Sequence, residues 1–529
     1  MIPRPDIDWF AIGPELITAV GAMLVLLVGL GKGAASRVAV TTLTLLTLGL
    51  ALAFAIARFH VTSYGAFNGQ VDSDELANVG RIIAAASGVI ATVFAVRGRA
   101  GDGRHGEFHA LLLSAVCGMG IFVAAGSFVS LFVGLELFSI ALYVLCALDA
   151  EKAASLESGL KYLILGGLSS AILLYGAALV YGATGSLDIA VAGDSGSRGV
   201  LLWTGAAMVI GGLGFKVSAA PMHWWTPDVY EGAGTPVTAF MSTATKSVAF
   251  LVLARVLTTG FVPEADAWQP VVAGLAVASI LVGNIGALVQ SNLKRLLGYS
   301  SIAQAGYLLV GLIGWQTSGI PALVYALFVY TAMTLGAFAY VVFIERELGR
   351  EVTFADLAGR GWAGEDASLL RALPGFGVAI CALSLAGIPP TAGFFSKFGL
   401  FGAAIDAGYG WLAVVGVLGS VISLAYYLRF VVELYMRAPD AARASAAAEA
   451  LPAGTTSTER IRMGRASVVA TVGVLLAATT LVLAFVPKSV FDLGCDAKRA
   501  LIVDGSACTQ HDGITTTVAA PETPATPAG

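Results

Sequence analysis

Charged residues are scarce in this 529-residue chain, where they make up 12% of the sequence, against about 25% in an ordinary soluble domain. This scarcity excludes a water-soluble enzyme. Cysteine is also scarce, with five residues and no Cys-x-x-Cys pair, and the five histidines form no cluster inside an apolar segment. We therefore expect no iron–sulfur cluster, haem or metal site on this chain, and any redox chemistry must occur elsewhere. The formal net charge of −4 offers no basic surface for nucleic acid.

Hydrophobic residues, in contrast, make up 57% of the chain. Runs long enough to cross roughly 30 Å of hydrocarbon predict an all-α polytopic membrane protein with about fourteen transmembrane helices. The predicted spans are 14–30, 38–57, 76–96, 108–125, 127–148, 160–181, 200–220, 237–257, 270–289, 300–315, 320–344, 373–405, 411–436 and 466–486.

Two of these runs carry the signature of a broken helix. The twelfth is too long for one straight span and contains Pro389 and Pro390, so we expect an interruption near its middle. The seventh run leads into Pro221, with Lys216 just before that proline, as Lys397 lies shortly after Pro390. Broken helices in corresponding positions of two halves point to an ion site in transporters with inverted repeats.

Lysine and arginine are distributed unevenly over the loops. The loops after odd-numbered spans hold seventeen of these residues, and the opposite loops hold seven. Because cytoplasmic loops carry the excess, both termini are predicted to lie outside the cytoplasm. The segment after Pro487 ends in a Thr-, Pro- and Ala-rich stretch, for which we expect a largely disordered external tail. In an oxidising compartment Cys495 and Cys508 form either a disulfide or two free thiols, and the sequence leaves both open.

Six basic residues remain inside predicted spans. Arg255 and Arg429 lie toward helix ends, where a long side chain can reach the headgroups by snorkelling. Lys161, near the start of its span, can also snorkel, although an acidic loop precedes it. The full set is Lys161, Lys216, Lys246, Arg255, Lys397 and Arg429.

Three of these lysines cannot snorkel, because Lys246 lies near the midpoint of its span and Lys216 and Lys397 lie beside the interruptions. Each costs about 2.5 to 3.5 kcal/mol at the bilayer centre. Glu136 is the one carboxylate expected at a comparable depth, and it cannot neutralise three ammonium groups. We interpret the set as a polar, partly hydrated row of lysines that gain and lose protons near the working pH. Lysines that simply hold helices together are the alternative.

Three segments carry a resemblance to a known family. These are GFKVSAAPMHWWTPDVYEGAGTPVTAFMSTATK (214–246), LKRLLGYSSIAQAGY (293–307) and the broken helix around 387–397. They resemble the antiporter-like membrane subunits of proton-translocating NADH:quinone oxidoreductase, or respiratory complex I, and of multisubunit sodium/proton antiporters. The resemblance extends over about 108–436.

This resemblance implies two inverted five-helix repeats, helices four to eight and nine to thirteen, with helices seven and twelve broken. The implied division of the chain is helices one to three (1–107), the first repeat (108–260), the second repeat (261–436), a cytoplasmic loop with helix fourteen (437–487), and the external tail (488–529).

The resemblance also implies roles for individual residues. Glu136 and Lys216 match the glutamate and lysine of the coupling ion pair. Lys246 matches the central lysine of the eighth helix, and Lys397 matches the lysine of the broken twelfth helix nearest the external exit. Among the complex I members, a lysine at position 397 argues against the subunit M type, which has a glutamate there. The lack of a long lateral helix argues against the subunit L type, which leaves the third antiporter-like type.

Two further matches are weaker. Lys161 matches a lysine of the sixth helix. His223 matches a histidine on the polar axis of the family, but an interfacial histidine beside Trp224 and Trp225 is an equal interpretation.

By this resemblance the chain is a proton-translocating subunit of the bacterial inner membrane with no cofactor of its own. FMN, iron–sulfur clusters and quinone are expected in partner subunits. The expected partners are other membrane subunits of complex I, including a neighbouring antiporter-like subunit, together with the lipid bilayer and protons. A sodium/proton antiporter subunit is the alternative, because the two groups share these motifs, and a purely structural membrane scaffold is a third hypothesis.

Overall fold

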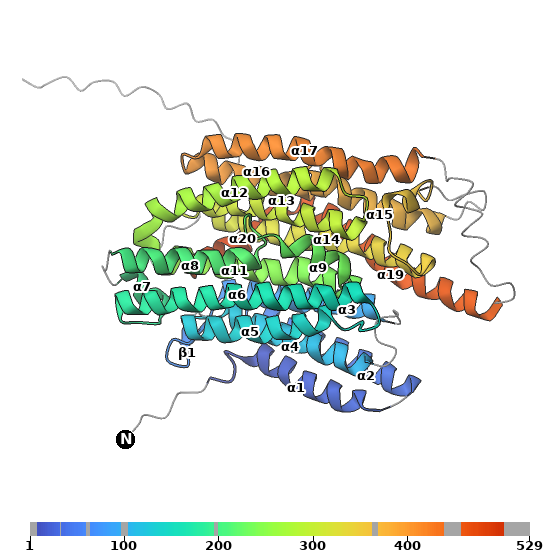
Figure 1. Cartoon of the computed structure of the whole chain (residues 1–529), viewed down its shortest axis with the longest axis horizontal. Helices are drawn as coiled ribbons and strands as arrows, with labels where there is room; N and C mark the ends of the chain where they lie inside the picture. Colours follow the sequence, from blue (N-terminus) through green and yellow to red (C-terminus); the bar gives the residue numbers. More distant parts are fainter. Residues whose placement is uncertain are drawn as a thin grey trace, which may run out of the picture.

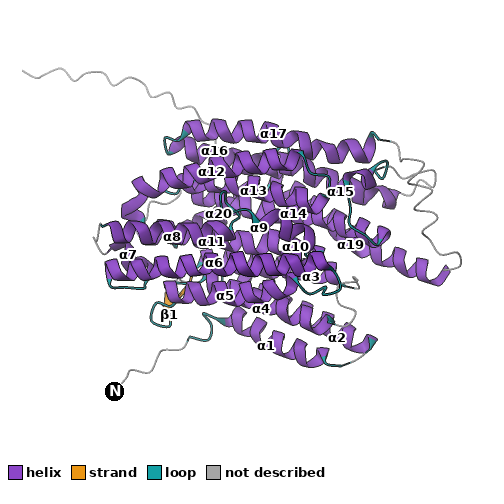
Figure 2. Ribbon diagram, viewed as in Figure 1, coloured by secondary structure: helices purple, strands orange, loops and turns teal. Residues whose placement is uncertain are grey.

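The computed structural model describes residues 8–31, 33–59, 64–96, 104–194, 199–361, 369–437 and 456–501. Within these residues the protein is a bundle of helices with a single two-stranded hairpin beside α5 (Figure 1; Figure 2). Eleven helices are long and apolar enough to cross a membrane, and three shorter apolar helices accompany them. Together these helices correspond one to one with the fourteen predicted spans, so the predicted polytopic all-α fold is confirmed.

Among the described residues, the first part of the chain contains the hairpin and nine helices. The hairpin pairs β1 (Tyr64–Ala66) with β2 (Val71–Ser73) in antiparallel register. The helices are α1 (Gly13–Gly29), α2 (Ala34–Ala57), α3 (Glu75–Ala95), α4 (His105–Val123), α5 (Phe128–Cys146), α6 (Ala153–Thr184), α7 (Ile189–Asp194), α8 (Val200–Lys216) and α9 (Trp225–Gly232).

The eighth span is one continuous helix of mixed geometry. Regular turns alternate with wider π-helical turns in the order α10 (Thr235–Phe240), η1 (Met241–Thr245), α11 (Lys246–Arg255) and η2 (Val256–Gly260). After the short 3₁₀ turn η3 (Val262–Glu264), the second part contains α12 (Ala265–Leu288), α13 (Leu293–Ile313), α14 (Gly319–Leu348), η4 (Phe354–Leu357), α15 (Leu369–Ala386), α16 (Ala392–Asp406), α17 (Gly410–Tyr435), α19 (Thr456–Phe485) and α20 (Pro487–Arg499).

Side-chain caps fix where several spans begin. The Ser127 hydroxyl accepts from the backbone amide of Ser130 and starts α5, and the Asp74 carboxylate accepts from Ala77 at the start of α3. The Asn292 carbonyl oxygen accepts from two amides in the first turn of α13. Such caps satisfy amides that the first helical turn leaves unpaired.

Both predicted interruptions are present. The seventh span divides into α8 and α9, separated by residues 217–224, and the twelfth divides into α15 and α16, separated by 387–391. Each gap contains a cis X-Pro bond, Ala220–Pro221 and Pro389–Pro390. The order of helices four to eight is therefore repeated in helices nine to thirteen: three continuous helices, an interrupted helix and a continuous helix. Because five spans is an odd number, the second set begins on the opposite face of the membrane and is inverted.

The helices follow the sequence across the molecule, from α1 at one flank to α17 at the other (Figure 1). The two repeats meet where α13 packs against α9 and α14 packs against α10 and α11. After α17 the chain returns to the middle, since α19 and α20 both pack against α14. The polar residues described below lie along this central contact.

The expected tail begins with a helix instead of an irregular segment. Residues of α20 dock on the end of α14, because the Lys498 ammonium donates to the carbonyls of Gln316 and Thr317 at 2.8 and 2.7 Å, and Gly494 contacts Pro321. Cys495 is disulfide-bonded. Its expected partner Cys508 and the rest of the tail lie outside the described residues.

Candidate functional site

Three of the predicted site lysines are buried in the protein. Lys216, Lys246 and Lys397, which we call the axis lysines, are 1%, 1% and 7% exposed. Lys216 is the last residue of α8, at the first interruption, and Lys397 lies in α16, just beyond the second. Lys246 follows the wider turn η1, a geometry that is frequent at functional sites.

Two buried arginines in the protein each have a carboxylate beside them. The Arg81 guanidinium lies 2.7 Å from the Glu15 carboxylate, and the Arg255 guanidinium lies 2.7 Å from that of Asp74. Among the described residues, no carboxylate lies within 4.0 Å of an axis lysine. Because a buried charge without a partner is strongly destabilising, the axis lysines differ from the structural ion pairs of the same protein.

Lys216 is held by a hydroxyl and by aromatic rings. Its ammonium donates to the Ser139 hydroxyl at 2.7 Å. Glu136 lies one turn before Ser139 on α5 and interacts with Lys216 electrostatically without a direct ion pair. Glu136 is half-buried, on a helix face shared with the exposed side chains of Val133 and Ile140. The carboxylate therefore lies at the partly exposed flank of α5.

Lys246 bridges the two repeats. Its ammonium donates to the backbone carbonyl of Ser301 in α13 at 2.6 Å and also to the Ser301 hydroxyl. The same hydroxyl lies 3.1 Å from the hydroxyl of Tyr330 in α14. A side chain of the first repeat is thus bonded to two helices of the second.

Lys397 is bound by the interruption itself. Its ammonium donates to the Ala386 carbonyl at 2.9 Å, a group at the end of α15 that the helix break leaves without an intrahelical partner. The ammonium also lies 4.5 Å from the ring centre of Tyr307. Gly387 has a φ of +84°, and a Cβ atom there would lie 3.0 Å from Cδ of Lys397. The turn at Gly387 therefore leaves the Ala386 carbonyl free and also lies directly against the Lys397 side chain.

A hydrogen-bonded row of neutral side chains lies between Lys246 and Lys397. Ser300, next to Ser301, is bonded to the Tyr427 hydroxyl of α17. The Gln304 amide lies 3.5 Å from that hydroxyl and donates to the Leu385 carbonyl at 3.1 Å. Since Leu385 adjoins Ala386, the row ends at the carbonyl next to the one that binds Lys397.

A second branch leaves Tyr307. Its hydroxyl accepts from the Asn284 amide at 3.0 Å, and the Asn284 carbonyl oxygen accepts from the Tyr426 hydroxyl at 3.0 Å. The sequence interpretation assigned no role to Ser300, Gln304, Asn284 or the tyrosines, although the 293–307 motif contains several of them. Their signal was present: polar residues recur every three or four positions along α13, which places them on one face of an otherwise apolar helix.

Lys161 lies apart from this row. It is 40% exposed and forms ion pairs at 2.7 Å with Glu157 on its own helix and with Asp228 of α9. Arg295 of α13 joins the cluster through Asp228 at 2.7 Å and Glu231 at 2.8 Å. The cluster fastens α6, α9 and α13 together at one end.

His223 lies in the interruption between α8 and α9. It is half-buried, hydrogen-bonds to the backbone of Pro221, and has no hydrogen bond to an axis lysine among the described residues. The adjacent Trp224 is 60% exposed, whereas Trp225 is buried. Position alone is compatible with both interpretations of this histidine.

The snorkelling expected of Arg255 is wrong. This residue is 3% exposed, and its guanidinium pairs with Asp74, the cap of α3, and with Asp72 of the hairpin at 3.1 Å. Carboxylates distant in sequence therefore satisfy it in place. Arg429 is half-exposed, donates to a backbone carbonyl and stacks on the Phe354 ring at 4.2 Å.

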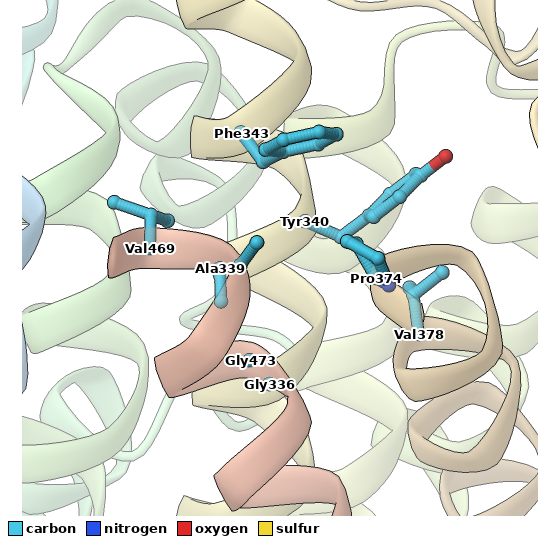
Figure 3. Close-up of a pocket in the computed structure, with 9 residues that line it drawn as sticks. Gly336, Ala339, Tyr340, Phe343, Pro374, Val378, Val469 and Gly473 are labelled. Carbon is cyan, nitrogen blue, oxygen red and sulfur yellow. The ribbon is translucent and has the colours of Figure 1, made fainter. Parts of the chain in front are cut away.

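A cavity between α14, α15 and α19 lies outside the row (Figure 3). Its volume is about 10 Å³, which is about the space of one water molecule. The lining is mostly apolar and includes Phe343, Val378 and Val469, without an axis lysine. The axis lysines are thus held by packed side chains and not by the wall of this cavity.

The family model described as "NADH:quinone oxidoreductase/Mrp antiporter, TM" matches residues 125–423, which contain Glu136, Lys161, His223 and the three axis lysines. The fold and this match define an antiporter-like membrane subunit. A subunit N 1 of NADH-quinone oxidoreductase from Rhizobium meliloti is 39% identical over 80% of this chain and 88% of its own length. A subunit N from Sphingopyxis alaskensis is 40% identical over 81% and 89%. The chain belongs to the subunit N family of NADH-quinone oxidoreductase. This is the third antiporter-like type, which remained after the sequence had argued against the subunit M and subunit L types.

Solved structures agree in fold. A chain of respiratory complex I from Thermus thermophilus has a TM-score of 0.74 and 32% identity, covering 90% of this chain and 98% of that one. A chain of the Mrp complex from Dietzia sp. has a TM-score of 0.77 at 22% identity, covering 93% and 97%. The second likeness concerns the fold alone.

Proposed function

We propose that this chain is a proton-translocating membrane subunit of NADH:quinone oxidoreductase, which couples electron transfer in partner subunits to proton pumping. The observation that carries the proposal is the row formed by the axis lysines, which are buried, lack a contacting carboxylate and are joined in part by hydroxyl and amide groups. The relatives are named as subunits of NADH-quinone oxidoreductase, which supports this enzyme as the complex in which the row acts.

The mechanism follows from the charges. When a charge change in a partner draws Glu136 away from Lys216, the ammonium loses stabilisation and its proton moves on; when the pair closes, Lys216 takes up another proton. Lys246 and Lys397 receive protons in turn through hydroxyl groups, which both donate and accept. Buried groups for which the described residues supply no hydrogen-bond partner, such as Glu136 Oε1 and the Thr245 hydroxyl, are of the kind that ordered water satisfies.

No cofactor on this chain is needed for this mechanism. FMN, iron–sulfur clusters and quinone would belong to the partners, which would include other membrane subunits of the complex and a neighbouring antiporter-like subunit. The half-buried position of Glu136 beside exposed apolar side chains supports contact with such a neighbour at this flank.

Glu136→Gln and Lys216→Ala test the function. We expect each to reduce NADH-driven proton uptake by inverted membrane vesicles by about tenfold or more, while the complex still assembles on native gels, because each removes one charge of the coupling pair. Lys152→Ala is a matched control, since Lys152 is 65% exposed and pairs with Asp149 at the surface. Wild-type pumping in both variants would refute the proposal, and sodium-dependent exchange without the redox subunits would favour the antiporter alternative.

We also propose that both termini lie outside the cytoplasm of a bacterial inner membrane. The loop charges support this orientation, and so does the disulfide at Cys495, which suits an oxidising compartment. After mild reduction, a membrane-impermeant maleimide should label the thiols released from the Cys495 disulfide in intact cells. Labelling only in inverted vesicles would reverse the orientation.

A further inference from the structure

Four aromatic rings surround the ammonium group of Lys216. They come from α5, α6 and α8, and the two tyrosines among them contact edge to face at 4.9 Å. The distances from Nζ to the ring centres are 5.2 Å for Phe138, 5.6 Å for Tyr143, 5.3 Å for Tyr162 and 5.8 Å for Phe215. We call these four residues the aromatic cage.

The other axis lysines are held differently. Lys246 and Lys397 each donate to a backbone carbonyl and lie near one ring. Lys216 has no carbonyl acceptor among the described residues, and its one hydrogen bond is to Ser139. An ammonium group is attracted to the face of an aromatic ring within about 6 Å, and the attraction is strongest where water is excluded. The rings therefore supply the stabilisation that carbonyls supply at the other two sites.

The helix interruption braces the cage. Trp225, in the first turn of α9, stacks on Tyr162 at 4.6 Å and on Phe215 at 5.3 Å, and its indole donates to the Phe215 carbonyl at 3.1 Å. Helix α9, which follows the break, thus packs against one ring of α8, which precedes the break, and against one ring of the neighbouring α6. Because Trp225 is buried, this brace is part of the core.

We propose that the aromatic cage is a positioning element that stabilises the ammonium of Lys216 while it is parted from Glu136. The inference rests on the proposed function. It adds a defined binding position for the Lys216 ammonium when Glu136 does not pair with it, which the ion pair alone does not provide. The titratable side chains around the cage are Glu136, Tyr143 and Cys146 of α5, Tyr162 of α6 and Tyr230 of α9.

The test compares ring removal with ring retention in the assembled complex. Tyr162→Leu removes one ring and should move the alkaline limb of the proton-pumping pH profile to lower pH by about one unit, a tenfold change in the equilibrium. Tyr162→Phe keeps the ring and should restore the limb. Phe122→Leu is the packing control, because Phe122 is buried against Phe138 at 5.4 Å and is not part of the cage.

A second substitution covers the case in which Tyr162→Leu fails to assemble. Trifluorophenylalanine introduced at position 138 weakens the negative face of the ring with little change in shape, and it should shift the limb in the same direction by a smaller amount. An unshifted limb in this variant, or equal shifts in Tyr162→Leu and Phe122→Leu, would overturn the cage. If Lys216→Ala pumps normally, the proposed function fails instead, so the two failures are distinguishable.

Discussion

Replacing Lys246 by leucine should abolish proton pumping without preventing assembly. Leucine is apolar, and it removes a charge whose burial at mid-bilayer costs about 2.5 to 3.5 kcal/mol, so the chain should still insert and fold. The row, however, would lose the group that joins α11 to Ser301 and Tyr330. We expect NADH-driven proton uptake to fall by about 10²-fold or more, measured in inverted vesicles beside a native gel.

The control for this result is Lys498→Leu. Lys498 is also buried and also donates to backbone carbonyls, but it does so on α20, away from the row. This variant should lower stability and leave pumping per assembled complex unchanged. If Lys246→Leu pumped as well as Lys498→Leu, the axis lysines would be structural and the chain would be a scaffold.

Replacing Gly387 by alanine should disable Lys397 without touching any titratable group. The φ of +84° disfavours a side chain by about 1 to 3 kcal/mol, and the new methyl group would lie 3.3 Å from the lysine nitrogen. The ammonium must then leave the Ala386 carbonyl, so we expect at least about a tenfold loss of pumping. Steady-state pumping and NADH:quinone turnover should fall together.

Gly402→Ala is the matched control for the glycine substitution. Gly402 lies on the same helix, α16, and an added Cβ there meets nothing within 4 Å. It should pump as the wild type does. Normal pumping by Gly387→Ala would mean that the turn does not hold Lys397 in place.

The sequence predicted the helices and the buried lysines because both follow from the cost of placing groups in hydrocarbon. Apolar length identified all fourteen spans. The prolines located both interruptions, and the lysines at positions 216 and 397 were found because charged groups are rare in such segments. These inferences need no knowledge of which helix lies beside which.

The contacts across helices could not be predicted in the same way. Arg255 found carboxylates that lie far away in the sequence, at Asp72 and Asp74. The rings of the aromatic cage had the composition of ordinary core residues, and a helix that is apolar all round gives no periodic signal of its neighbours. Helix α20 was missed for another reason. Its hydrophobic residues are spaced so that they lie on one face of the helix, and the expectation of a disordered tail was based on composition, which does not reveal such spacing.

The groups between Lys246 and Lys397 include serine and tyrosine hydroxyls, each able to turn so that donor and acceptor exchange places. Under the proposed function, such groups set no direction of transport by themselves. The direction would then have to come from the event that separates Glu136 from Lys216, and a sufficiently large opposing proton gradient would reverse the flow.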